Sequence, residues 1–92
     1  MNGQKIIRKH LTFTGRVQGV GFRYRAQSIA STLGLTGYVK NMYNGTVEAE
    51  AQGEPHLIDE LIRRLKNASY IRIEYVAEYD VPLREENSFR ID

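Results

Sequence analysis

The order in which two hydrophobic periods follow one another narrows the possible folds of this chain. Residues 6–14 alternate apolar and polar side chains, with Lys9 as the exception, which is typical of a strand. The next apolar side chains recur at helical spacing, at Phe22, Ala26, Ile29, Ala30 and Leu33. Gly34 follows them, as glycine often does at the end of a helix. The chain therefore starts with a strand, a glycine-rich connection and an amphipathic helix.

The rest of the chain repeats this arrangement after a hairpin. Strands are expected at about 36–42 and 46–52, because the Asn44-Gly45 pair between them is a strong hairpin signal. Pro55 then opens a helix whose apolar stripe consists of Ile58, Leu61, Ile62 and Leu65. A long strand is expected at 71–81, with one face formed by Ile71, Ile73, Tyr75, Ala77 and Tyr79. A short strand around 89–91 ends the chain.

The order β-α-β-β-α-β plus a terminal strand predicts an α+β fold of the ferredoxin-like, split βαβ type. In this fold an antiparallel sheet carries two helices on one face. A chain of 92 residues has the length of one domain, so residues 1–92 are expected to form a single unit. This architecture does not decide function, since it hosts enzymes, RNA binders and regulatory modules.

Composition excludes several kinds of site. The chain has no cysteine, so it has no disulfide, no thiolate nucleophile and no cysteine-based metal centre. His10 and His56 lack the spacing of metal ligands, and no metal or cofactor is expected. No apolar run approaches the length of a membrane span, and the N-terminal segment lacks a continuous apolar stretch. We therefore expect a cytoplasmic protein without membrane contact.

The charge distribution favours an anionic ligand on the first half of the chain. Residues 1–47 contain seven basic and no acidic residues, whereas residues 48–92 contain eleven acidic and six basic residues. The halves therefore carry +7 and −5, which sum to the net charge of +2. If the two halves interleave in space, however, their fields cancel.

The segment GRVQGVGFR at 15–23 points to an anion site. Its glycines allow positive φ angles, and the free amides of the following helix N-terminus favour an anion. Arg23 can add a bidentate contact to phosphate. Neither a dinucleotide fingerprint nor a P-loop fits, because Tyr24 replaces the third glycine and Phe22-Arg23 replaces Lys-Ser/Thr. Alternatively, the glycines only form a tight connection and Arg23 is solvated.

The same segment, together with GYVKN at 37–41, NGTVE at 44–48, QG at 52–53 and the F-x-I ending at 89–91, resembles acylphosphatase over nearly the whole chain. This resemblance implies hydrolysis of the carboxyl–phosphate bond of small acyl phosphates, without a metal or cofactor. It implies that Asn41 orients the attacking water. It also implies that the phosphate is bound by Arg23 and by loop amides, namely those of Val17, Gln18, Gly19, Val20, Gly21 and Phe22.

Two other functions stay open at this stage. Acylphosphatase-like domains also occur within larger proteins that mature metalloenzymes, so the chain could be a non-catalytic module that binds phosphate or carbamoyl phosphate. An RNA-binding ferredoxin-like domain would need aromatic side chains on the exposed sheet face. The third strand instead offers Glu48, Glu50 and Gln52 there. We expect a monomer that binds no nucleic acid; whether the carboxylate of Asp92 positions Arg23 is left open.

Overall fold

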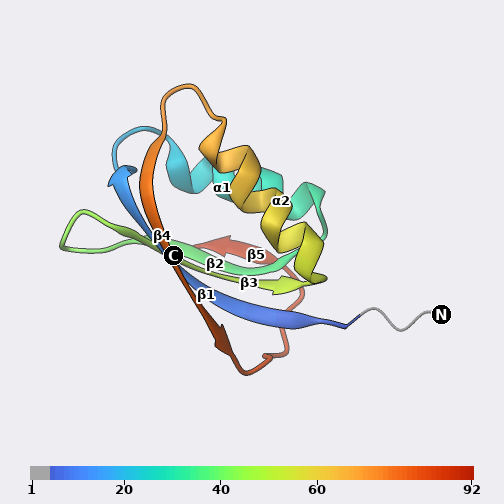
Figure 1. Cartoon of the computed structure of the whole chain (residues 1–92). Helices are drawn as coiled ribbons and strands as arrows, with labels where there is room; N and C mark the ends of the chain where they lie inside the picture. Colours follow the sequence, from blue (N-terminus) through green and yellow to red (C-terminus); the bar gives the residue numbers. More distant parts are fainter. Residues whose placement is uncertain (1–4) are drawn as a thin grey trace.

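The computed structural model describes residues 5–92, so residues 1–4 of the predicted domain lie outside the described residues. Two helices and five strands follow one another in the predicted order (Figure 1). They are β1 (Ile7–Arg16), α1 (Phe22–Thr32), β2 (Thr36–Asn41), β3 (Val47–Gly53), α2 (Pro55–Lys66), β4 (Arg72–Val81) and β5 (Phe89–Ile91).

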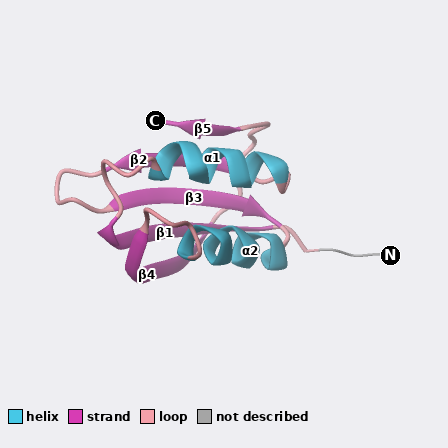
Figure 2. Ribbon diagram, turned by 90° about the horizontal axis from the view of Figure 1, so that it is seen from above, coloured by secondary structure: helices cyan, strands magenta, loops and turns pink. Residues whose placement is uncertain are grey.

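The strands form one sheet in the order β4-β1-β3-β2-β5. The four long strands pair antiparallel, and both helices cover the same face, which confirms the predicted ferredoxin-like fold (Figures 1 and 2). Viewed from above, α1 lies over β2 near β5, whereas α2 lies on the side of β1 and β4 (Figure 2). The short β5 adds a parallel pairing with β2, because the chain crosses from one edge of the sheet to the other after β4.

The core lies between the helices and the covered face of the sheet. Leu11 and Phe13 of β1 are fully buried there, as alternation predicted. The helical stripes also face the sheet, with Ile29 and Leu33 partly buried and the other members buried: Phe22, Ala26, Ala30, Ile58, Leu61, Ile62 and Leu65. Burial of each large aliphatic or aromatic side chain stabilises the fold by about 1.5–3 kcal/mol.

The predicted face of β4 is wrong, because a bulge interrupts the alternation. Thr14 pairs with Tyr75 but Gly15 pairs with Ile73, so Glu74 is an extra residue on β4. Ile71 and Ile73 pack against the core on the covered face, and beyond the bulge Val76 takes their place. Tyr75 and Tyr79 are 65% and 61% exposed on the uncovered face. The bulge thus turns the tyrosines away from the core.

The uncovered face carries an ionic network centred on Arg8, whose side chain is fully buried. Its Nε donates to Glu50 on β3 over 2.6 Å, and its Nη1 donates to Glu86 in the β4–β5 connection. The side chain of Gln52 also bonds to both backbone groups of Arg84 in this connection. These contacts hold the β4–β5 connection against the uncovered face of the sheet.

Candidate functional site

The loop between β1 and α1 is anchored at both ends by buried aromatic packing. Phe13 near the end of β1 and Phe22 at the start of α1 place their ring centroids 4.9 Å apart. Val17, the first residue after β1, is 1% exposed. Both ends of the loop are therefore fixed to the core.

This loop presents free backbone amides at the start of α1. Within residues 5–92, the amides of residues 18–24 donate no hydrogen bond to another protein group. Gly21 is the N-cap residue of α1 with φ of +76°, and no side chain caps the helix. Gly19 has φ of +72°, a conformation that glycine adopts without steric cost. The loop therefore has the unpaired donors and helix dipole that favour an anion.

A small cavity of about 110 Å³ lies inside this loop. The end of β2 contributes Asn41, which is exposed, and the first turn of α1 contributes the half-buried Arg23. Neither side chain hydrogen bonds to any other group within the described part of the chain. The cavity thus brings together two residues that are 18 positions apart in the sequence. Its lining comprises Val17, Gly19, Gly21, Phe22, Arg23, Tyr24 and Asn41.

Two residues of the predicted phosphate loop, Gln18 and Val20, do not line the cavity. The side-chain amide of Gln18 donates to the carbonyl oxygens of Met42 and Thr46, over 2.7 and 2.9 Å. It therefore ties the loop to the β2–β3 turn, a role for which the sequence offers no signal. The side chain of Val20 lines another hollow instead of the cavity. Conversely, Tyr24 lines the cavity, although sequence reasoning did not select it.

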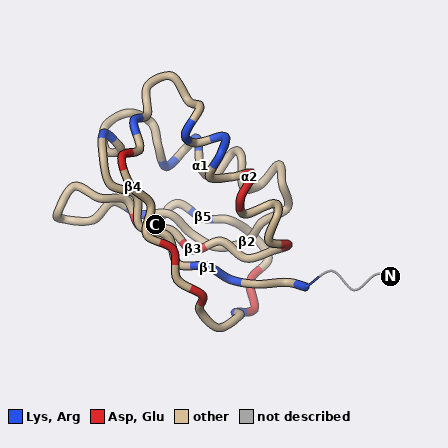
Figure 3. Tube along the Cα trace, viewed as in Figure 1, with Lys and Arg blue, Asp and Glu red and all other residues tan. Residues whose placement is uncertain are grey.

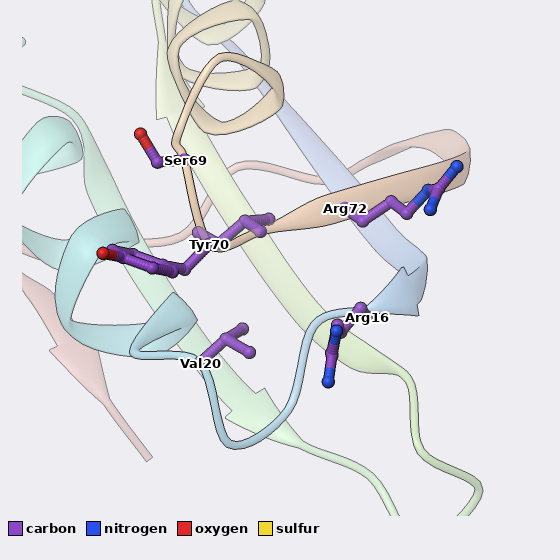
Figure 4. A pocket seen from close by; sticks show the side chains of 6 residues that line it. Arg16, Val20, Ser69, Tyr70 and Arg72 are labelled. Atoms are coloured by element: carbon purple, nitrogen blue, oxygen red, sulfur yellow. The ribbon is translucent and has the colours of Figure 1, made fainter.

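That other hollow, of about 430 Å³, lies between the loop and the start of β4 (Figure 4). Val20 and Tyr70 line it together with Arg16 and Arg72, whose side chains extend in different directions (Figure 4). It shares no lining residue with the small cavity. The two arginines therefore do not form a second, converging anion site in this structure.

Charge pairing between the halves of the chain leaves three arginines at or beside the loop without an ion pair. Lys9 pairs with Glu78 and Lys40 lies 3.8 Å from Glu48, while Arg8 pairs with Glu50 and Glu86. The segregated charges thus interleave and cancel across the sheet. Among the ion pairs of residues 5–92, none includes Arg16, Arg23 or Arg25. Basic residues gather where β1 ends and α1 begins (Figure 3).

The carboxyl end of the chain makes no ion pair with Arg23. The side chain of Asp92 lies 3.5 Å from Nε of Arg90, and its amide donates to the carbonyl oxygen of Val39. Across residues 5–92, no three His, Cys, Asp or Glu side chains are grouped so that they could hold a metal ion. Neither of the two helices described is long and apolar enough to span a membrane.

Sequence comparison identifies the family. A profile described as Acylphosphatase matches residues 9–91, which is most of the chain. The chain belongs to the acylphosphatase family. An acylphosphatase from Bifidobacterium longum is 39% identical over 84 residues, which cover 90% of this chain and 87% of that protein. The resemblance inferred from the sequence motifs is thereby confirmed.

Solved structures agree with this assignment. An acylphosphatase from Coxiella burnetii superposes with a TM-score of 0.87 at 33% identity, covering 95% of this chain and 93% of that one. The chain is also similar to part of full-length HypF in a phosphate- and nucleotide-bound form, with a TM-score of 0.84 and 29% identity. That match covers 96% of this chain but only 12% of HypF. A domain similar to this chain therefore makes up nearly all of one solved chain and a small part of another.

Proposed function

We propose that this member of the acylphosphatase family hydrolyses small acyl phosphates to a carboxylate and inorganic phosphate. The observation that carries the proposal is the convergence of Arg23, Asn41 and a loop with free amides on one cavity of about 110 Å³, which Gly19, Gly21 and Phe22 also line. An anion in this cavity would meet donors from the loop, the first helical turn and the end of β2. No other hollow described in the chain combines these features.

Arg23 and the loop amides are proposed to bind the phosphoryl group. The planar guanidinium can donate two parallel hydrogen bonds to phosphate oxygens, and unpaired amides at a helix N-terminus add further donors. Because Arg23 is paired with no carboxylate among residues 5–92, its charge is available to the substrate. The loop is already shaped, so these donors need little reorganisation when charge develops on the phosphate.

Asn41 is proposed to hold the attacking water through its side-chain oxygen. The water oxygen forms a bond to phosphorus while the bond from phosphorus to the acyl oxygen breaks and leaves its electron pair on the carboxylate. The water proton passes to phosphate or solvent. A carboxylate has a conjugate-acid pKa of about 4, so it departs without a general acid. A loose transition state needs a placed water more than a strong base, and none of the residues that line the cavity has a carboxylate side chain.

The proposal includes a monomeric, cytoplasmic enzyme that needs no metal or cofactor and binds no nucleic acid. Glu48 and Glu50 lie half-buried on the uncovered face of the sheet, where a nucleic-acid binder of this fold would use basic and aromatic groups. Their negative charge would repel a phosphate backbone. The small-molecule substrate would instead enter at the loop, where Arg16, Arg23 and Arg25 carry positive charge without an ion pair.

The second candidate is a non-catalytic module that binds phosphate or carbamoyl phosphate. The similarity to a segment of HypF favours it, because that longer protein was seen in a phosphate- and nucleotide-bound form. Both candidates require anion binding at the same cavity. They differ in whether a bound acyl phosphate is hydrolysed.

Hydrolysis of acetyl phosphate in buffer containing EDTA tests the proposal. The protein is compared with Arg23→Ala, Arg23→Lys and Asn41→Ala, and with Arg25→Ala as a matched control for loss of a positive charge. We expect Arg23→Ala to lower kcat/KM by roughly 10³-fold, as loss of a transition-state arginine does elsewhere. Arg23→Lys should also lower kcat/KM strongly, because lysine lacks the planar guanidinium that donates two parallel hydrogen bonds. Asn41→Ala should lower kcat by roughly 10²-fold and leave inhibition by phosphate unchanged.

Each outcome separates the candidates. Turnover in EDTA supports a metal-independent enzyme. Retained turnover in Arg25→Ala shows that loss of a positive charge near the loop does not by itself abolish activity. Phosphate binding without turnover in a folded protein would favour the second candidate. Wild-type turnover in Asn41→Ala would remove the role proposed for that residue.

A further inference from the structure

Tyr24 lines the cavity without a part in the proposed chemistry. It follows Arg23 in the first turn of α1 and is 72% exposed, so its ring is not part of the core. Its hydroxyl makes no hydrogen bond within the described residues. Of the cavity's two aromatic side chains, Phe22 is 2% exposed and packs against Phe13. Tyr24 therefore offers the only free aromatic surface among the residues that line the cavity.

The size of the cavity places the acyl group outside it. A volume of about 110 Å³ is on the order of what a phosphoryl group with its oxygens needs. Once a phosphoryl group fills the cavity, little of this volume is left for an acyl chain or ring. The acyl group must then lie at the mouth of the cavity, against whichever exposed side chain borders it.

The in-line geometry of the attack on phosphorus determines on which side of the cavity mouth the acyl group lies. The attacking and leaving oxygens lie roughly in line across phosphorus. If Asn41 holds the water at the end of β2, the acyl oxygen leaves away from β2 and toward α1. Tyr24 is the exposed apolar surface that α1 contributes to the cavity.

We propose that Tyr24 contacts the acyl group and makes the enzyme selective for acyl phosphates with an aromatic or flat apolar acyl part. This inference rests on the proposed function, because it assigns the second half of the same substrate. A planar acyl group would stack on the ring in an offset or edge-to-face arrangement. A short aliphatic acyl group such as acetyl would contact only a small part of the Tyr24 ring.

A neighbouring hollow of about 540 Å³ is the competing position for the acyl group. It shares Asn41 with the cavity and is lined also by Gln18, Lys40, Met42 and Tyr43. It lies on the side from which the water is proposed to attack, so in-line displacement disfavours it. Tyr43 is fully exposed there and provides a matched control, since it is also a surface tyrosine beside the site.

The test compares kcat/KM for benzoyl phosphate with that for acetyl phosphate in the protein and in Tyr24→Ala, Tyr24→Phe and Tyr43→Ala. We expect Tyr24→Ala to lower the benzoyl-to-acetyl ratio about three- to tenfold, as loss of an aromatic pair does. Tyr24→Phe should retain the ratio because it retains the ring. Tyr43→Ala should leave the ratio unchanged. Alanine is the best helix former, so Tyr24→Ala should keep α1 intact.

Failure of the proposed function would be seen as no hydrolysis of either substrate by the unmodified protein. The results below are therefore distinct from it. If acetyl phosphate is hydrolysed but Tyr24→Ala leaves the ratio unchanged, the inference is wrong. An equal loss for both substrates would assign Tyr24 a structural role and also overturn it. A lowered ratio in Tyr43→Ala alone would move the acyl group to the hollow beside β2.

Discussion

At Gly15 a Cβ atom would lie 2.1 Å from the carbonyl oxygen of Arg72, on the neighbouring strand. This glycine therefore serves the close approach of β1 and β4 at the bulge, although it belongs to the loop motif in the sequence. Gly21 differs, because a Cβ atom there would meet no atom within 4 Å and only its φ of +76° favours glycine. The two glycines of this motif are thus required for different physical reasons, close strand approach at Gly15 and a positive φ at Gly21.

This difference predicts unequal effects of two alanine substitutions on stability. Gly15→Ala forces the backbones of β1 and β4 apart and should lower the free energy of unfolding by roughly 3 kcal/mol or more. Gly21→Ala has space and should cost only about 1–2 kcal/mol for its left-handed conformation. Urea unfolding of both variants measures these values. Equal losses would mean that the approach at Gly15 relaxes freely.

At the scale of elements, two connections meet at the site through the side chain of Gln18. Its two hydrogen bonds reach from the β1–α1 loop to the carbonyl oxygens of Met42 and Thr46. The β2–β3 turn has a further local bond, from the amide of Thr46 to the side chain of Asn44. Gln18 thus fixes the turn, and the adjacent Asn41, relative to the β1–α1 loop.

Replacing Gln18 with methionine should loosen this link and retain the side-chain volume. Each lost hydrogen bond contributes about 1 kcal/mol, and the part-buried carbonyl oxygens of Met42 and Thr46 each keep a backbone donor, so a fall of about 1–2 kcal/mol in unfolding free energy is expected. The kcat for acetyl phosphate should fall, with a smaller change in inhibition by phosphate, because the loop amides stay in place. Thermal unfolding and steady-state kinetics check both effects. A variant with wild-type kcat would show that Asn41 needs no such support.

The order of elements could be predicted from the sequence because it depends on local periodicity. The stripe from Phe22 to Leu33 and the Asn44-Gly45 turn act over a few residues. The face of Tyr75 and Tyr79 could not be predicted, because the bulge that reverses it arises from pairing with Gly15. The same limit applies to the site. The loop pattern indicates Arg23 and the family motif indicates Asn41, whereas the reach of Gln18 depends on a turn 24 residues away.

For the whole molecule, the Arg8 network joins β1, β3 and the β4–β5 connection. Burial would raise the pKa of Glu50, but hydrogen bonds from His10 and Arg8 lower it below its ordinary value of 4.5. Burial would likewise raise the pKa of Glu86, but hydrogen bonds from Arg90 and Arg8 lower it below its ordinary value. Both carboxylates therefore favour the folded state while they are ionised.

Acid should remove this stabilisation. The contribution is present above the ordinary carboxyl pKa of 4.5 and is lost as the pH falls through the lower pKa values of the folded state. Glu50→Gln should lower the unfolding free energy by about 1–3 kcal/mol at pH 7 and show a smaller further loss at pH 3. Urea midpoints at both pH values test this, with the exposed Glu85→Gln as control. Parallel losses in the variant and the unmodified protein would exclude Glu50 as a source of acid sensitivity.

The two sides of the cavity are aligned by a strand that lines no part of it. Val47 of β3 pairs with Asn41 on one side and with Phe13 on the other, while β1 and β2 never touch as neighbours in the sheet. A slip of β3 by two residues against β1 would keep Val47, Ala49 and Ala51 on the covered face. It would nevertheless carry Asn41 about 7 Å from its place beside the loop. If Asn41 holds the water as proposed, turnover therefore measures strand alignment. A chain that refolds with this slip would bury its core and still be inactive.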